Sequence, residues 1–270
     1  MAFSPCGQRL ATAGLDRAVA LSEAETGKVH LVLKGHTGCV LTVSFSANGE
    51  RLASGGEDLS IRIWDTTTGL LLRTVKDEFR NVVCQVQFSP TDNRVVASVD
   101  DREIFDNRLK LWDADTGEMI NCFRGTRFVR FPPDGRAIAT CGDSWTPGPN
   151  SNRNMRLVNA QSGAVLFTLP GHTGLVRSAS FSMDGGSKIA SGSEDGTCKV
   201  WDSSTGALMH SFSLPWSVVS VWWGRDWVMD TQRAMAFAMG HHPRLGAVSW
   251  VQGLDVELVR MILDYTQGPH

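Results

Sequence analysis

The feature that most constrains this chain is an internal repeat. The four residues GHTG at 35–38 return unchanged at 171–174. The segment FSANGERLASGGEDLSIRIWDTTTG at residues 45–69 can also be laid over four others, at residues 3–27, 88–117, 131–163 and 181–206. A repeat of this length predicts one recurring supersecondary unit that cannot bury its apolar surface without a neighbouring unit.

Each unit reads as four short strands joined by tight turns. VLTVSF alternates apolar and polar residues as a half-buried strand does, and SANGE after it has the residues of a turn. RLASG, SIRIWD and LLLRTV supply three further strands. The positions equivalent to Trp64 are Ser22, Trp112, Val158 and Trp201, at spacings of 42, 48, 46 and 43 residues. The predicted units cover residues 1–34, 38–75, 81–124, 127–169 and 174–214, with an extra strand at 217–223.

These units resemble the WD40-repeat family over residues 1 to about 223. The pair GH occurs in two units and WD in three, at the period of about 40–45 residues expected for one propeller blade. The resemblance implies an all-β fold, a WD40-type β-propeller of about five four-stranded blades at residues 1–224. A short α-helical tail is expected at 225–270.

The ends of the predicted propeller leave its closure open. The first unit starts almost at Phe3, so its innermost strand is expected to be missing. The strand from Val218 to Trp223 is predicted to complete that blade and close a five-bladed ring, which would remove exposed sheet edges. The alternatives are an open arc, a fragment of a longer propeller, or incomplete propellers that pair with each other.

Two sets of polar residues recur at the blade spacing, and they raise the question of catalysis. Ser, His and Asp together are the residues of a nucleophilic triad, so a hydrolase is a remote alternative. The resemblance instead implies structural hydrogen-bonded chains that run from the surface inward, and a satisfied network of this kind makes a blade rigid. The two sets are His36, Ser54, Asp58 and Trp64, and His172, Ser191, Asp195 and Trp201.

The resemblance also points to a rim that binds a protein or peptide. Two enlarged loops on this rim each hold one large aromatic residue, Phe105 and Trp145, of a kind that often anchors interfaces. Trp145 has an alternative role, which is to fold back over the fourth unit and compensate its missing Trp. The remaining predicted rim residues are Thr42, Gln85, Phe128, Ser178, Glu57 and Glu194.

Composition excludes several other classes. The formal net charge of −2 and the lack of a strongly basic stretch give no sign of a nucleic-acid surface. No apolar run is long enough for a membrane span, and the first residues lack the pattern of a secretory signal. Six cysteines are scattered singly, which predicts neither a metal site nor disulfides, and no cofactor is expected. A cytoplasmic or nuclear location is the simplest expectation.

The tail carries a second functional hypothesis. Leu254, Leu258 and Ile262 fall on one face of a predicted helix within LDVELVRMILDY, which resembles the first helix of an F-box. The leading hypothesis is a non-catalytic scaffold that binds a protein or peptide through the propeller rim. The alternative is a substrate receptor or adaptor of a ubiquitin ligase that docks through this helix, and the competing interpretation is a helix packed on the propeller or on a second copy.

Overall fold

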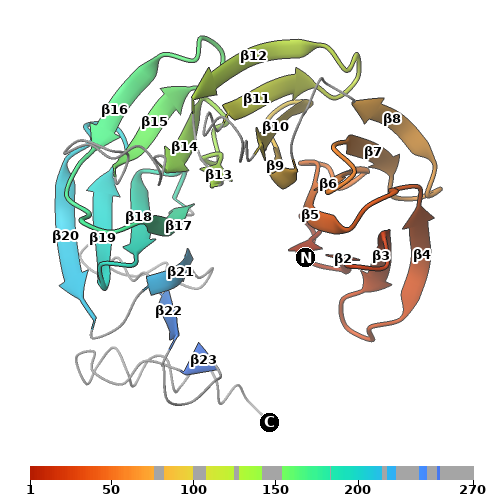
Figure 1. Cartoon of the computed structure of the whole chain (residues 1–270), viewed down its shortest axis with the longest axis horizontal. Helices are drawn as coiled ribbons and strands as arrows, with labels where there is room; N and C mark the ends of the chain where they lie inside the picture. Colours follow the sequence, from red (N-terminus) through yellow and green to blue (C-terminus); the bar gives the residue numbers. More distant parts are fainter. Residues whose placement is uncertain are drawn as a thin grey trace. The chain divides into compact units, whose positions relative to one another are not determined.

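The computed structural model describes residues 1–75, 82–99, 108–124, 128–141, 154–182, 184–214, 218–222, 237–241 and 248–249. Their contacts divide the chain into two compact units, Met1–Pro170 and Gly171–His270, which are described separately. Unit 1 contains four four-stranded antiparallel sheets, and unit 2 contains one four-stranded and one three-stranded sheet (Figure 1). The described residues contain strands and no helix. The predicted all-β fold of four-stranded blades is therefore confirmed.

The strands follow one another in sequence order across every sheet. The strands of unit 1 are β1 (Ala2–Phe3), β2 (Arg9–Ala13), β3 (Ala18–Glu23), β4 (Val29–Lys34), β5 (Val40–Phe45), β6 (Arg51–Gly56), β7 (Ile61–Asp65), β8 (Leu71–Val75), β9 (Val83–Phe88), β10 (Arg94–Val99), β11 (Arg108–Asp113), β12 (Met119–Arg124), β13 (Val129–Arg130), β14 (Ala137–Cys141), β15 (Met155–Asn159) and β16 (Val165–Leu169). Those of unit 2 are β17 (Val176–Phe181), β18 (Lys188–Ser193), β19 (Thr197–Asp202), β20 (Leu208–Ser213), β21 (Val218–Trp222), β22 (Phe237–His241) and β23 (Val248–Ser249).

The turn between the third and fourth strands of a blade has a clear sequence cause. In the second blade, Asp65 Oδ1 accepts hydrogen bonds from the backbone N–H groups of Thr67 at 2.9 Å and Thr68 at 2.7 Å. Gly69 then takes a φ of 76°, which a residue with a Cβ rarely adopts. Asn159 forms the same pair of bonds in the fourth blade, so Asn can replace the Asp of the repeat.

Apolar side chains pack between successive sheets of unit 1. Leu21 and Leu33 of the first blade meet Phe45 and Trp64 of the second in one buried cluster. Equivalent clusters join the second blade to the third and the third to the fourth. The four blades of unit 1 thus bury apolar surface against their neighbours within the unit, as the repeat predicts.

Polar bonds also link successive sheets at their first strands, where β5 lies beside β9 and β9 contacts β13 (Figure 1). Thr42 Oγ1 accepts from the N–H of Val86, and Ser44 Oγ accepts from the N–H of Phe88, both at 3.0 Å. Two glutamines of β9 repeat this pattern toward β13: the N–H groups of Val129 and Phe131 donate to Gln85 and Gln87 at 3.1 Å. Polar side chains of β5 and β9 therefore hold neighbouring blades together through the backbone of the next first strand.

The structure corrects the predicted closure of the first blade. Its inner position holds β1, a strand of only two residues, which pairs with β2 through Ala2↔Ala11 and Phe3↔Leu10, so this strand is short but not entirely missing. The predicted lone strand is observed as β21, but it pairs with β22 and starts a further sheet instead of completing the first blade. Pairing with a segment close in sequence closes a much shorter loop, which costs less conformational entropy.

The tail prediction is also partly wrong, because β22 and β23 are strands within residues 225–270. FAMGH is too short, and too rich in small residues, to show a strand pattern in the sequence. The predicted helix at 254–265 lies outside the described residues. In the part of the chain that is described, no helix is long and apolar enough to cross a membrane.

Candidate functional site

The polar set of the second blade forms one continuous chain of hydrogen bonds. Asp58 Oδ2 lies 2.8 Å from His36 Nδ1, and His36 Nε2 lies 2.7 Å from Ser54 Oγ. The indole N–H of Trp64 donates to Ser54 Oγ at 2.8 Å. These hydrogen bonds connect His36 in the loop before β5, Ser54 on β6 and Trp64 on β7, so they hold three separate segments together.

The protonation states of this chain follow from burial and from its partners. Burial lowers the pKa of His36, so the imidazole is neutral at pH 7 although Asp58 and its hydrogen bond favour the charged form. Burial alone would raise the pKa of Asp58, but hydrogen bonds from Thr37, Ser60 and His36 outweigh it and lower this pKa. A carboxylate can only accept, so His36 Nδ1–H donates to Asp58 and Nε2 accepts from the Ser54 hydroxyl. Ser54 Oγ then accepts the indole N–H, and every polar atom in the chain is satisfied.

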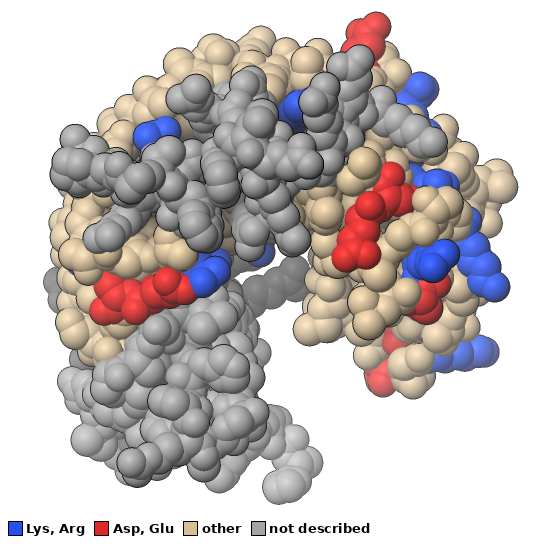
Figure 2. All heavy atoms as spheres, viewed as in Figure 1, with Lys and Arg blue, Asp and Glu red and all other residues tan. Residues whose placement is uncertain are grey.

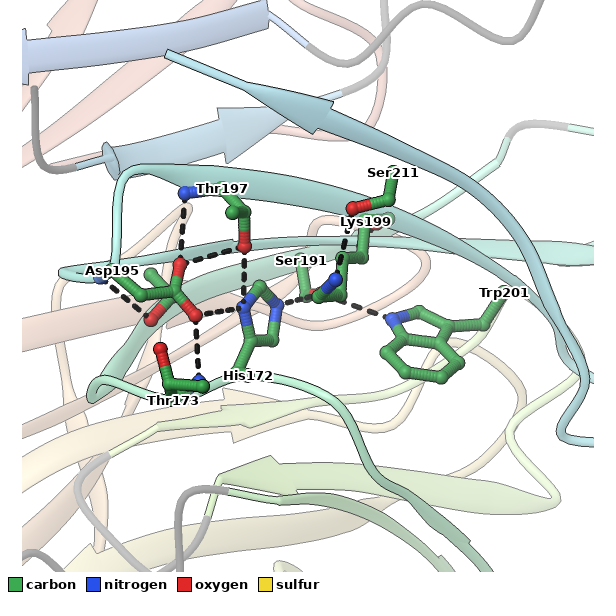
Figure 3. A network of polar contacts seen from close by, with 9 residues as sticks. His172, Thr173, Ser191, Asp195, Thr197, Lys199, Trp201 and Ser211 are labelled. Carbon is green, nitrogen blue, oxygen red and sulfur yellow. Dashed lines mark hydrogen bonds and ion pairs between the residues drawn. The ribbon is translucent and has the colours of Figure 1, made fainter. Parts of the chain in front are cut away.

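The fifth blade repeats the chain with one addition (Figure 3). His172 bonds to Asp195 at 3.0 Å and to Ser191 at 2.8 Å, and Trp201 Nε1–H donates to Ser191 Oγ at 3.0 Å. Thr197 Oγ1 also donates to Asp195 Oδ1 at 2.6 Å and lies 3.0 Å from His172 Nδ1. The imidazole N–H of this blade is therefore shared between a carboxylate and a hydroxyl oxygen.

The repeated GHTG sequence is explained by close backbone contact. A Cβ atom at Gly38 would lie 2.8 Å from the backbone nitrogen of Asp58, and one at Gly174 would lie 2.6 Å from that of Asp195. Real side chains do not come that close, so only glycine lets the loop reach the turn Asp. The same loop supplies the N–H of Thr37 and of Thr173 to that Asp at 3.0 and 2.8 Å.

Although the order Asp–His–Ser is that of a catalytic triad, the serine is not presented to a substrate. Ser54 and Ser191 are both 0% exposed. In each blade the serine oxygen, which would be the nucleophile, already accepts an indole N–H. The arrangement is suited to rigid cross-linking of strands.

The predicted rim residues on the first strands are buried or half-buried. Thr42 and Gln85 are half-buried and bond to the backbone of the next blade. Phe128 is only 9% exposed, and the guanidinium carbon of Arg130 lies 5.0 Å from the centre of its ring. Ser178 is buried. These four side chains offer little free surface.

The other predicted rim residues fall into two groups. Glu57 and Glu194 are exposed, each directly before the turn Asp of its blade. Phe105 and Trp145 lie outside the described residues, so both roles considered for Trp145 stay predictions.

A β-bulge at the start of the first strands exposes residues that the sequence pattern does not reveal. The pairing register shifts between Val40 and Thr42, and again between Val176 and Ser178. The extra residues are Leu41, which is 45% exposed, and Arg177, which is also exposed. Bulges re-aim side chains, but nothing in a short alternating sequence marks the residue at which one occurs.

Leu15, Cys39, Leu41 and Glu57 form a patch, here called the rim patch, on the loops of the first two blades. The N–H of Val40 donates to the carbonyl of Gly14 at 3.1 Å, and the N–H of Glu57 donates to the carbonyl of Cys39 at 2.9 Å. Leu15 is 82% exposed. Two turns and the start of β5 thus present two exposed leucines beside a carboxylate. More widely, the face shown in Figure 2 carries acidic patches with Lys and Arg among them, so it has no single sign of charge.

The described residues contain no group of three His, Cys, Asp or Glu side chains that could hold a metal ion. Five of the described cysteines form no disulfide: Cys6, Cys39, Cys84, Cys122 and Cys198. Burial raises the pKa of Cys198 to about 12, so that thiol stays protonated.

Two segments of the chain, residues 27–65 and 163–202, match the family described as WD domain, G-beta repeat. The nuclear distribution protein PAC1 of Coccidioides posadasii (strain C735) is 30% identical over 243 residues, which cover 75% of this chain and 48% of PAC1. Autophagy-related protein 16 of Arabidopsis thaliana is 27% identical, over 73% of this chain and 36% of its own length. The guanine nucleotide-binding protein subunit beta-2 of Nicotiana tabacum is 28% identical, over 48% and 34%.

The chain thus spans about half or less of the length of these relatives. Both matched segments include the end of one repeat and the GH-to-WD stretch of the next, where the polar chains lie. Matching segments, relatives and four-stranded blades agree, and the chain is a WD40-repeat protein.

Proposed function

We propose that this protein is a non-catalytic scaffold that binds a protein or peptide partner through the loop rim of its blades. The observation that carries the proposal is the rim patch. Leu15 and Leu41 expose apolar surface beside Glu57 on loops held by hydrogen bonds, and exposed apolar groups with a polar border are typical of interaction sites.

The polar chains support the non-catalytic part of the proposal. Ser54 and Ser191 would be the nucleophiles of a hydrolase, and both are buried and hydrogen-bonded to an indole. Attack on a substrate would require the blade to open. Burial in a satisfied network supports a structural role in holding the rim loops in place.

The relatives give general support. One of them is named as a subunit of a guanine nucleotide-binding protein, which is a protein that functions with other chains. The adaptor hypothesis depends on residues 254–265, which lie outside the described residues, and no observation in the structure favours it. Binding through the rim is therefore the function proposed.

The proposal is tested by affinity capture with the full chain. The variant Leu15→Ser/Leu41→Ser should lose most of the captured partner, because it removes the exposed apolar surface and leaves the core intact. Leu70→Ser is the matched control, since Leu70 is also exposed, at 64%, but lies in the turn before β8. Equal capture by all three proteins, or equal loss in both variants, would reject the rim as the binding site.

A further inference from the structure

A glutamate directly before the turn Asp occurs in two blades, and the structure gives it a cation in one of them. In the fifth blade, Arg177 Nε–H donates to Glu194 Oε1 at 2.7 Å, and Nη2 of the same guanidinium also contacts this oxygen. Arg177 is the bulge residue of β17. The carboxylate at this position of a blade is thus well placed to receive a guanidinium from the adjacent first strand.

In the described part of the chain, the equivalent carboxylate of the second blade has no such cation. Glu57 takes the place of Glu194, but the bulge residue is Leu41, which carries no charge. Among the described residues no Lys or Arg lies within ion-pair distance of Glu57. Arg17 is close enough for its charge to act on Cys39, yet it forms no ion pair with Glu57.

The backbone that carries the Glu57 side chain is nevertheless held in place. The N–H of Glu57 is bonded to the Cys39 carbonyl, and the next residue is the turn Asp58 of the polar chain. The Glu57 carboxylate lies close enough to the Cys39 thiol to raise the pKa of that thiol, together with burial. An exposed carboxylate on a fixed backbone, with no cation beside it among the described residues, is available to bind one from outside.

We propose that the rim patch binds an arginine side chain of the partner, whose guanidinium pairs with Glu57 while its methylene groups lie on Leu41 and Leu15. The inference rests on the proposed rim function and specifies the partner's chemistry. Arginine fits better than lysine, because its planar fork can form two bonds to a carboxylate and its long stem covers apolar surface. Arg177 on Glu194 shows the same chemistry within this chain.

The test uses the full chain and four pools of synthetic decapeptides, with Arg, Lys, Ala or Glu fixed at the centre of an otherwise mixed sequence. Binding is measured by fluorescence anisotropy at low and at physiological salt. The Arg pool should bind at least about tenfold more tightly than the Ala and Glu pools, since pairing of a desolvated interfacial charge has an effect of this order or larger. Glu57→Gln should remove that preference, whereas Glu194→Gln, the matched control, should keep it.

One exchanged variant tests the geometry. Leu41→Arg should rebuild in the second blade the internal pair of the fifth, occupy Glu57 and abolish the preference for the Arg pool without lowering the thermal midpoint.

The inference is overturned if the Arg pool has no advantage, or if Glu57→Gln or Leu41→Arg binds it as the unmodified protein does. If the arginine test fails in one of these ways but Leu15→Ser/Leu41→Ser still loses the captured partner, the proposed rim function is retained and only the proposed arginine recognition is wrong.

Discussion

The second and fifth blades contain the same polar chain but differ in what surrounds it. In the second, Ser60 Oγ donates to the turn Asp at 2.8 Å; in the fifth, Thr197 takes this place and also reaches the imidazole. On the third strand, Lys199 Nζ donates to Ser211 Oγ at 2.9 Å. The equivalent Arg62 has a buried Nε with no partner among the described residues.

The comparison separates the residues that form the polar chain from the residues that satisfy the polar groups around it. His, Ser, Asp and Trp at fixed spacing establish the inner chain in both blades, with bond lengths that agree to 0.2 Å. The neighbouring residues on the third and fourth strands decide how completely the surroundings are satisfied. The fifth blade is the more fully bonded of the two.

Removing the central hydroxyl should have the largest effect. Ser54→Ala and Ser191→Ala each strand two buried groups, the imidazole Nε2 and the indole N–H, so each should lower the free energy of unfolding by about 2–4 kcal/mol. Urea denaturation measures this change, and Thr67→Ala in an exposed turn is the control. The two costs should be similar because the lost partners are the same. A difference above about 1 kcal/mol would show that the surrounding residues also act on the hydroxyl.

Acidification should have the second-largest effect, and it should lower the free energy of unfolding through both blades. Burial lowers the pKa of His36 and of His172 in the folded state, so the unfolded chain binds protons first as the pH falls. The stabilisation by the neutral imidazoles is present above about pH 6.5 and is lost as the pH falls through that value toward the folded pKa. Urea midpoints between pH 7.5 and 5 should therefore decrease, and the protection of the Trp64 and Trp201 indole N–H groups, relative to the intrinsic exchange rate at each pH, should fall. A flat profile over this range would contradict the neutral assignment.

Exchanging the basic residue on the third strand, Arg62 or Lys199, should have the smallest effect. It tests directly why the surroundings of the two polar chains differ. In the register of the two blades, Arg62 stands opposite Thr74 as Lys199 stands opposite Ser211. Arg62→Lys should remove the orphan Nε and allow a bond to the Thr74 hydroxyl, which would stabilise the protein by about 0.5–1 kcal/mol. Thermal unfolding measures it, with Lys199→Arg as the reverse exchange. If Arg62→Lys destabilises, then the weak pair between Arg62 and Asp58, at 3.9 Å, matters more than the orphan atom.

The rim was less predictable than the polar chains. Glu57 and Glu194 are predicted to lie on it because they adjoin the turn Asp, and the structure shows that both are exposed. Thr42 and Gln85 were predicted to face a partner, but their oxygens accept from backbone N–H groups of the next blade. A single strand does not show which of its side chains a neighbouring blade will use.

By itself, the sequence determined the repeat and the four-stranded blade, because these depend on alternation, turn residues and spacing along one unit. The resemblance to WD40 repeats implied the order of the hydrogen-bonded chain. Tertiary structure decided what depends on contacts between segments. It gave β21 a partner in β22 and inserted a bulge that exposes Leu41. Among the described residues, it also paired Glu194 with an arginine but not Glu57. The physical reason is that a local pattern limits each strand's own conformation, whereas pairing, bulges and ion pairs depend on which other strand lies beside it.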